Sequence, residues 1–274
     1  MLHDWQGATA RLRDCSLGRV IHAAPEMVST QTPAKEAARA GVGHGTVFVA
    51  EHQTCGRGRR DRAWHSIPGR DLMFSVLLRP TAAMQYAPLL NLAAALAVAR
   101  ALGAFPEIAD RAAIKWPNDV LIGDRKMCGI ICETAGGVSG WQYAVLGIGI
   151  NCNRVEAELP KLDSPDRPPS TSLRIETGRT VDLPRLLADV LTALDETSGM
   201  IACDSGRASL VAAYRARCCT LERQVRIVTD EGDFEGIGAE ITPQGALVVQ
   251  GASERRVFDV GDVVHARLRT REIS

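Results

Sequence analysis

The order of the apolar segments constrains the fold of this chain more than any other feature of its sequence. Short β-prone runs at 46–51 and 72–78 are followed by an alanine- and leucine-rich stretch at 84–102, which predicts a buried helix. Further apolar runs lie at 127–132 and 143–150. Because helices and strands do not alternate one for one, this order predicts an α+β fold with a mixed, largely antiparallel sheet backed by helices.

Two further helices and a loop are predicted from local signals. Thr32 and Pro33 precede AKEAARA, so a helix is expected to begin at this cap and to end at Gly41. Asp182, followed by Pro184, opens a second helix whose leucine and valine side chains share one face. Four prolines between 160 and 169 predict a long loop.

The composition changes near residue 220. From residue 225 onward, short β-prone runs are separated by the polar turns DEGD, TPQG and VGD. With 274 residues, the chain is long enough for one large domain and a small one. We therefore predict a large domain at 1–220 and a small C-terminal β-barrel domain at 221–274.

The composition argues against several classes of protein. The 32 basic residues balance the 32 acidic residues, so we expect no general attraction to nucleic acid or to an anionic membrane. The eight cysteines contain no CxxC pair, which is typical of reduced thiols in the cytoplasm. The first 14 residues lack the apolar core of a secretory signal, and polar residues interrupt the stretch at 84–102. These observations predict a cytoplasmic protein with no membrane span.

Residues 56–62 (GRGRRDR), here called the arginine segment, carry four arginines and two glycines. Four guanidinium groups this close repel one another unless an anion lies among them, and glycines let backbone amides approach a ligand. The segment lies between two predicted strands, where loops commonly display functional groups. We predict a phosphate or carboxylate site; the alternative is a solvated surface loop.

Two other motifs supply complementary groups. Residues 115–119 (KWPND), with Lys126 further on, place two ammonium groups and a carboxylate around a turn. Such groups can neutralise phosphate charge and hold Mg²⁺, although a Pro-Asn turn with an Asp cap is the alternative interpretation. Residues 145–151 (VLGIGIN) alternate glycine within a strand, which suggests close approach of backbone or ligand. The sequence contains neither a Walker A motif nor a G-x-G-x-x-G turn after a strand.

Taken together, these motifs resemble those of the biotin protein ligases, enzymes that attach biotin to carrier domains of carboxylases. The resemblance implies the class II aminoacyl-tRNA synthetase-like catalytic fold of biotin and lipoate ligases, with a small C-terminal SH3-like β-barrel. The residues that carry it are Ser29, Thr30, Gln31, Gln53, the arginine segment, Trp64, the KWPND motif, Lys126, Gly147, Gly149, Asn151, Thr171, Ser172 and Leu173.

The resemblance implies that biotin reacts with ATP to give biotinyl-5′-adenylate and pyrophosphate. The acyl group then passes to a lysine of a biotin carboxyl carrier protein. ATP and Mg²⁺ are co-substrate and metal, and no tightly bound prosthetic group is expected. Only 28 residues precede Ser29, too few for the N-terminal DNA-binding domain of some family members, so we expect a monofunctional enzyme without nucleic-acid binding. A homodimer is plausible by resemblance.

The same resemblance assigns roles to individual residues. For catalysis they are Lys126, Arg57 and Lys115. For biotin binding they are Ser29, Thr30, Gln31, Gln53, Arg57, Gly58, Arg59, Lys126 and Gly129. For nucleotide binding they are Arg59, Arg62, Trp64, Lys115, Asn118 and Asn151, and Asp119 would hold Mg²⁺.

Several alternatives stay open at the level of sequence. Ser29 and Thr30 could cap a helix, Trp64 could belong to the core, and Asn151 could satisfy a turn. A lipoate-type ligase shares the fold and the adenylate chemistry, and a biotin- or carrier-binding protein without turnover would share the site.

The chain also departs from the commonest family pattern at three positions. Cys55 stands where a small residue without a thiol is more usual, Gln31 where many members have Asn, and Asp61 where Gly is frequent. Cys55 places an oxidisable thiol in the loop, and Asp61 partly neutralises the positive charge of the arginine segment. None of the three removes a proposed charged contact.

Overall fold

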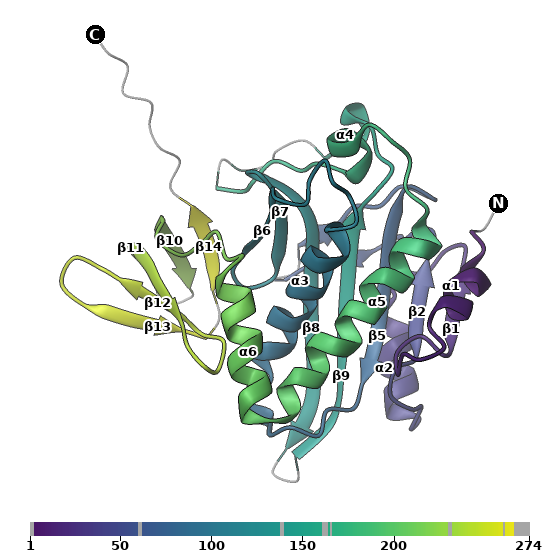
Figure 1. Ribbon diagram of the computed structural model, residues 1–274, viewed down its shortest axis with the longest axis horizontal. Coiled ribbons are helices and arrows are strands. Elements are labelled where there is room, and N and C mark those ends of the chain that lie inside the picture. Colours follow the sequence, from purple (N-terminus) through teal and green to yellow (C-terminus); the bar gives the residue numbers. More distant parts are fainter. Residues whose placement is uncertain are drawn as a thin grey trace.

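A seven-stranded sheet forms the centre of the molecule (Figure 1). The computed structural model describes residues 3–59, 62–137, 140–160, 164, 166–229, 232–259 and 261–265. The strand order is β1-β2-β5-β9-β8-β7-β6, and every pair is antiparallel except β1 with β2. The prediction of a mixed, largely antiparallel sheet is therefore confirmed. The strands are β1 (Ile21–Ala24), β2 (Val47–Ala50), β5 (Asp71–Leu78), β6 (Ala112–Lys115), β7 (Asp119–Ile122), β8 (Arg125–Gly137) and β9 (Gly140–Asn151).

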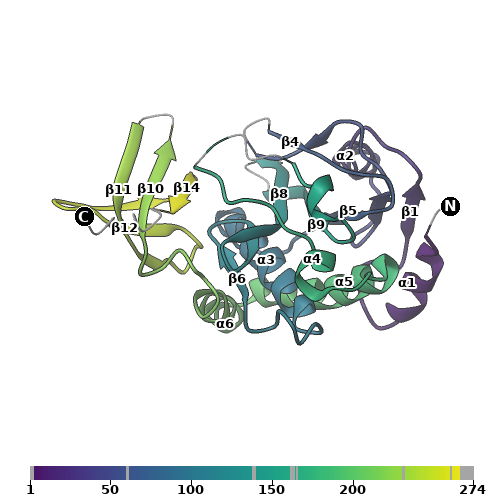
Figure 2. The same ribbon diagram turned by 90° about the horizontal axis from the view of Figure 1, so that it is seen from above.

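Helices cover both faces of this sheet, as the view from above shows (Figure 2). Helices α3, α5 and α6 lie on one side, and α2 lies on the other. The helices are α1 (Trp5–Arg11), α2 (Gln31–Arg39), α3 (Pro88–Leu102), α4 (Leu173–Thr177), α5 (Leu183–Gly199) and α6 (Asp204–Arg215), with short 3-10 turns at Met84–Tyr86, Glu156–Glu158 and Met200–Ala202.

Helix α3 lies in the core, as its composition predicts. Twelve of its fifteen residues are buried, because it packs between the sheet and α5 and therefore has no polar face. Small alanine side chains allow the close approach of α5, where Thr197 Oγ1 donates to the carbonyl of Ala93 at 3.0 Å. Among the described residues, no helix has the length and apolarity needed to cross a membrane.

The other predicted helices differ in how well their caps were placed. Helix α5 begins after Asp182, whose carboxylate accepts from the amide of Arg185, and the prediction is confirmed. Helix α2 begins at Gln31, so the predicted cap at Thr32 is wrong. Thr30 occupies the cap position without a side-chain capping bond, because its hydroxyl contacts Gln53 and Ser75 instead. That hydroxyl turns away from the helix and toward the sheet.

The C-terminal strands form a second, five-stranded antiparallel sheet in the order β13-β12-β11-β10-β14. It lies beside α6 and β6 (Figure 1), and each β-prone run after residue 225 contributes a strand. The predicted barrel is not closed among the described residues, since β13 and β14 end the strand order without pairing. The strands are β10 (Gln224–Thr229), β11 (Gly232–Ile241), β12 (Leu247–Gln250), β13 (Arg255–Phe258) and β14 (Asp262–His265).

Candidate active site

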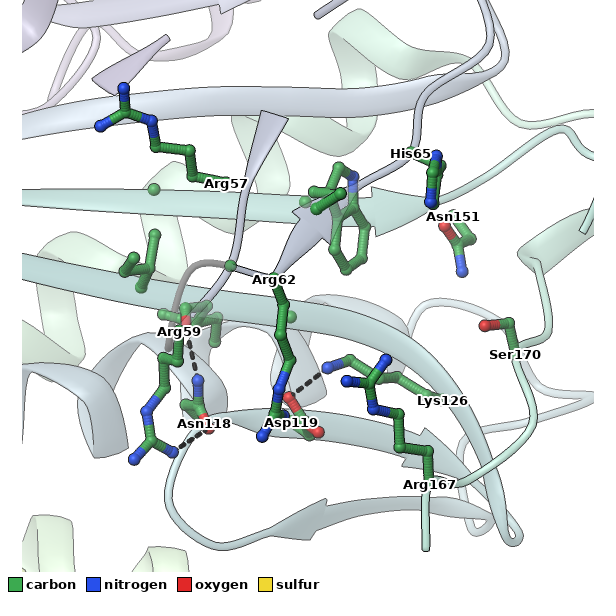
Figure 3. A pocket seen from close by; sticks show the side chains of 18 of the residues that line it. Arg57, Arg59, Arg62, His65, Asn118, Asp119, Lys126, Asn151, Arg167 and Ser170 are labelled. Carbon is green, nitrogen blue, oxygen red and sulfur yellow. Dashed lines mark hydrogen bonds and ion pairs between the residues drawn. The ribbon is translucent and has the colours of Figure 1, made fainter. Parts of the chain in front are cut away.

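One cavity of about 870 Å³ brings together every site residue that the sequence singled out (Figure 3). Its walls come from the sheet, the arginine segment, the loop before α4 and strand β14. The predicted residues that line it are Ser29, Thr30, Gln31, Gln53, Arg57, Gly58, Arg59, Arg62, Trp64, Lys115, Asn118, Asp119, Lys126, Gly129 and Asn151.

The end of the cavity near α2 is polar but uncharged. Gln53 Oε1 accepts from the amide of Thr30 at 2.8 Å and from its hydroxyl at 3.2 Å. Thr30 Oγ1 also lies 2.8 Å from Ser75 Oγ, so these buried groups hold one another in fixed positions. Gln31 Nε2 donates to the carbonyl of Ile131 at 3.4 Å, but its buried Oε1 has no partner among the described residues. An unpartnered buried acceptor facing a cavity suits a ligand N–H.

Glycines and an indole ring form one wall of the cavity. Gly129 and Gly149 are directly paired neighbours on β8 and β9. A Cβ at Gly149 would lie 2.6 Å from Trp64 Cε2, and one at Gly129 would lie 2.8 Å from Trp64 Cζ3. The ring of Trp64 therefore rests on two positions that any larger residue would block. Trp64 Nε1 is buried and has no partner in the part of the chain that the structure describes, which is consistent with a ligand-facing side chain rather than a satisfied core residue.

Cations gather around Asp119 at the centre of the cavity (Figure 3). Lys126 Nζ lies 2.6 Å from Asp119 Oδ1 and 5.9 Å from the centre of the Trp64 ring. Lys115 is buried at the end of β6, and burial lowers the pKa of its ammonium group; Asp119 opposes this shift and Lys126 adds to it. A bound polyanion would favour the charged form of Lys115.

The arginine segment reaches across the cavity to the C-terminal sheet. Arg59 Nη1 donates to Asn118 Oδ1 at 3.2 Å, and its Nη2 donates to the carbonyl of Gly261 at 3.1 Å. Arg62 forms an ion pair with Asp262. Arg57 is exposed and points away from this cluster in Figure 3. Two residues of the predicted segment, numbers 60 and 61, lie outside the described residues.

A buried ion pair fixes the segment that returns from the arginines to β5. Arg154 Nε donates to both carboxylate oxygens of Asp71, at 2.8 and 2.9 Å, and the two side chains are 2% and 0% exposed. Burial raises the pKa of the Asp71 carboxyl, while the hydrogen bonds and charge of Arg154 oppose that rise. Arg154 Nη2 also donates to the carbonyl of His65. This arginine therefore ties the residue after Trp64 to the sheet.

The sequence reasoning missed several residues that line the cavity. Arg154 follows Asn151 by three positions, but a single arginine there carries no signal in the sequence. Asp262 was missed because its segment was interpreted as part of a separate barrel. Arg167 was missed because its stretch was interpreted as a loop. The residues missed are His65, Arg154, Glu158, Asp166, Arg167, Ser170 and Asp262.

The cavity carries an excess of positive charge. Among its described lining residues, seven Lys and Arg side chains face four Asp and Glu side chains. No cluster of three or more His, Cys, Asp or Glu that could hold a metal occurs among the described residues. The described lining is thus that of a site for anions.

Comparisons with known proteins point in one direction. A family described as "Biotin/lipoate A/B protein ligase family" matches residues 25–151, and "Biotin protein ligase C terminal domain" matches residues 220–266. A biotin--[acetyl-CoA-carboxylase] ligase from Mycobacterium tuberculosis is 35% identical over 231 residues, covering 81% of this chain and 80% of the relative. A bifunctional ligase/repressor from Bacillus spizizenii is 31% identical over 222 residues, and the match spans 81% of this chain but only 66% of that relative.

A solved structure resembles the whole fold. The biotin protein ligase from Aquifex aeolicus, in complex with biotin and ATP, superimposes with a TM-score of 0.75 and 27% sequence identity. The superposition covers 92% of this chain and 100% of the other.

Proposed function

We propose, because this chain belongs to the biotin/lipoate A/B protein ligase family, that it activates biotin with ATP and transfers it to a lysine of a biotin carboxyl carrier protein. The observation that carries the proposal is the cavity itself. An uncharged polar end with an unpartnered Gln31 acceptor leads into a centre where Lys115 and Lys126 lie beside Asp119. This arrangement fits a substrate with a neutral urea at one end and a carboxylate at the other.

In the first step, an oxygen of the biotin carboxylate attacks the α-phosphorus of ATP. The bond between the α-phosphorus and the oxygen that bridges the α- and β-phosphates breaks, and pyrophosphate leaves. Both reactants are anions, so the barrier falls when fixed cations neutralise them in the transition state. Lys126 and Arg57 are proposed to act on the carboxylate and α-phosphate, with Lys115 as a further cation. No residue needs to become a covalent nucleophile. The rest of the rate enhancement comes from holding biotin and ATP in a reactive geometry.

In the second step, the amine of a carrier lysine attacks the acyl carbon of biotinyl-5′-adenylate. AMP leaves, an amide forms and one proton is released. The adenylate must stay protected from water until the carrier arrives. We propose that the arginine segment covers it, since Arg59 contacts Asn118 and Gly261 and Arg62 pairs with Asp262 of β14. Residues Arg59, Arg62, Trp64, Asn118 and Asn151 are proposed to hold the nucleotide.

We further propose two domains, 1–220 and 221–274, supported by the separate family match at 220–266. Ligase activity without DNA binding is supported by the balanced net charge. A cytoplasmic location is supported by eight cysteines without a disulfide. Homodimer formation stays a proposal that sedimentation of the purified protein would decide.

The test of the main proposal is a single incubation with ATP, Mg²⁺ and either biotin or lipoate. We expect mass spectrometry to detect biotinyl-adenylate, and a carrier domain to gain one biotinyl group when it is added. Lipoate should give little adenylate, because it has no ureido N–H for the buried Oε1 of Gln31 to accept from. Efficient use of lipoate with no use of biotin would reassign the chain to the lipoate branch, and binding of biotin without adenylate would leave a non-catalytic binding protein.

A substitution at Gly149 tests the proposed role of Trp64 beside adenine. In Gly149→Ala, the new methyl group would displace the indole, and stacking of a base on an aromatic ring contributes about 1–3 kcal/mol. We expect the KM for ATP to rise by roughly tenfold or more. Gly199→Ala is the matched control, because a Cβ there meets no atom within 4 Å. An unchanged KM for ATP in Gly149→Ala would remove Trp64 from the nucleotide site.

A further inference from the structure

The proline-rich stretch at 160–169 has no role in the function described so far. Its last residues nevertheless reach the cavity, which is lined by Asp166, Arg167, Pro168 and Ser170. Helix α4 begins only after this stretch, at Leu173. The described part of the stretch thus lines the cavity before the next helix, and it contains a turn in which the amide of Arg167 donates to the carbonyl of Ser164 at 3.2 Å.

Backbone hydrogen bonds join this stretch directly to Lys126. The amide of Lys126 donates to the carbonyl of Pro169 at 2.7 Å, and its carbonyl accepts from the amide of Thr171 at 2.9 Å. Lys126 and Ser170 form a parallel bridge at this point. The proposed catalytic lysine is therefore held by residues 169–171 as well as by its own strand.

The backbone hydrogen bonds between Lys126 and residues 169–171 position the nearby Arg167 at the cavity. Its guanidinium group points toward Lys126 and Asp119 (Figure 3), and it lies at the opposite side of the cavity from Arg57. The neighbouring Asp166 is paired with Arg226 of β10 at 2.8 Å, which anchors the stretch to the C-terminal sheet as well. Arg167 is thus positioned from two sides.

We propose that Arg167 binds the β- and γ-phosphates of ATP and stabilises the pyrophosphate that leaves. This inference rests on the proposed function. A guanidinium group suits phosphate, since its planar fork donates two parallel hydrogen bonds. Arg57 lies on the opposite side of the cavity, whereas Arg167 and Lys126 both lie beside Asp119, which would hold Mg²⁺ on the phosphate chain.

The experiment separates the two half-reactions. In Arg167→Ala, we expect kcat/KM for ATP in pyrophosphate release to fall on the order of a hundredfold. The same variant, given preformed biotinyl-adenylate and carrier domain, should transfer biotin at the wild-type rate, because that intermediate has no β- or γ-phosphate. Arg167→Lys should retain more activity than Arg167→Ala, since it keeps the charge but not the fork.

Arg179→Ala is the control, because Arg179 is an exposed arginine paired with Glu107 outside the cavity. It should match the wild type in both half-reactions, and both variants should unfold at the wild-type temperature. Equal slowing of both half-reactions in Arg167→Ala would overturn the proposal, and so would wild-type pyrophosphate release. Failure of the wild-type protein to form any adenylate would instead refute the proposed function.

Discussion

Replacing Lys126 with alanine should nearly abolish adenylate formation and leave the folded state almost as stable as before. The ammonium group lies in the cavity, 2.6 Å from Asp119, on a side chain that is 27% exposed. Removal of one preorganised charge contact in a transition state lowers kcat on the order of 10²–10³-fold. Partly exposed ion pairs contribute only about 0–1 kcal/mol to stability. Pyrophosphate release and the urea unfolding midpoint measure the two effects separately.

Lys35 offers a matched control for this experiment. Its ammonium group lies 3.0 Å from Glu133, and its side chain is 21% exposed, but it does not line the cavity. Lys35→Ala should therefore keep the wild-type rate and show a similar small change in unfolding free energy. If Lys126→Ala loses stability in proportion to its activity, then Lys126 is a structural residue, and its proposed catalytic role is wrong.

Replacing Arg154 with methionine should lower the free energy of unfolding by about 3–5 kcal/mol, because it leaves the buried carboxylate of Asp71 without its partner. This is a large share of a stability that amounts to about 5–15 kcal/mol in most proteins. The loss should also free the carbonyl of His65, so that the segment from Arg62 to His65 is held less well. Chemical denaturation gives the first effect, and the KM for ATP gives the second.

The double substitution Arg154→Met with Asp71→Asn tests the cause. Asparagine removes the buried charge but can still accept from the amide of Ile67, as Asp71 does at 3.2 Å. Part of the lost stability should return in the double variant relative to Arg154→Met alone. Additive losses from the two single changes would mean that the pair is not coupled.

The large elements were predictable because their signals are local. Helix α3 is apolar on all sides, and the runs that became β2, β5, β8 and β9 are rich in strand-forming residues. The cap of α2 was misplaced by two residues because the hydroxyl of Thr30 bonds Gln53 and Ser75, which are remote in sequence. Tertiary contacts decided what local preference could not.

The residues of the candidate site likewise fall into those that local sequence predicts and those that only tertiary contacts reveal. The charged residues of the arginine segment and the KWPND motif were visible because several of them cluster within a few positions of the sequence. Arg154 and Arg167 were not, since a single arginine in a loop carries no pattern, and only the pairing with Asp71 or the backbone attachment to Lys126 reveals their positions. The contact of the arginine segment with Asp262 joins two parts of the chain that sequence had treated as separate.

The contact between the arginine segment and the C-terminal residues also affects the order in which the cavity forms. The hydrogen bond from Arg59 to the carbonyl of Gly261 joins residues 202 positions apart. Contacts between such distant residues form late, because a long loop must close before they can be made. During translation, the ribosome completes both lysines and the glycine-lined wall long before residue 261 emerges. A nascent chain that has not yet reached residue 261 therefore carries both lysines without the contacts of Gly261 and Asp262 with the arginine segment.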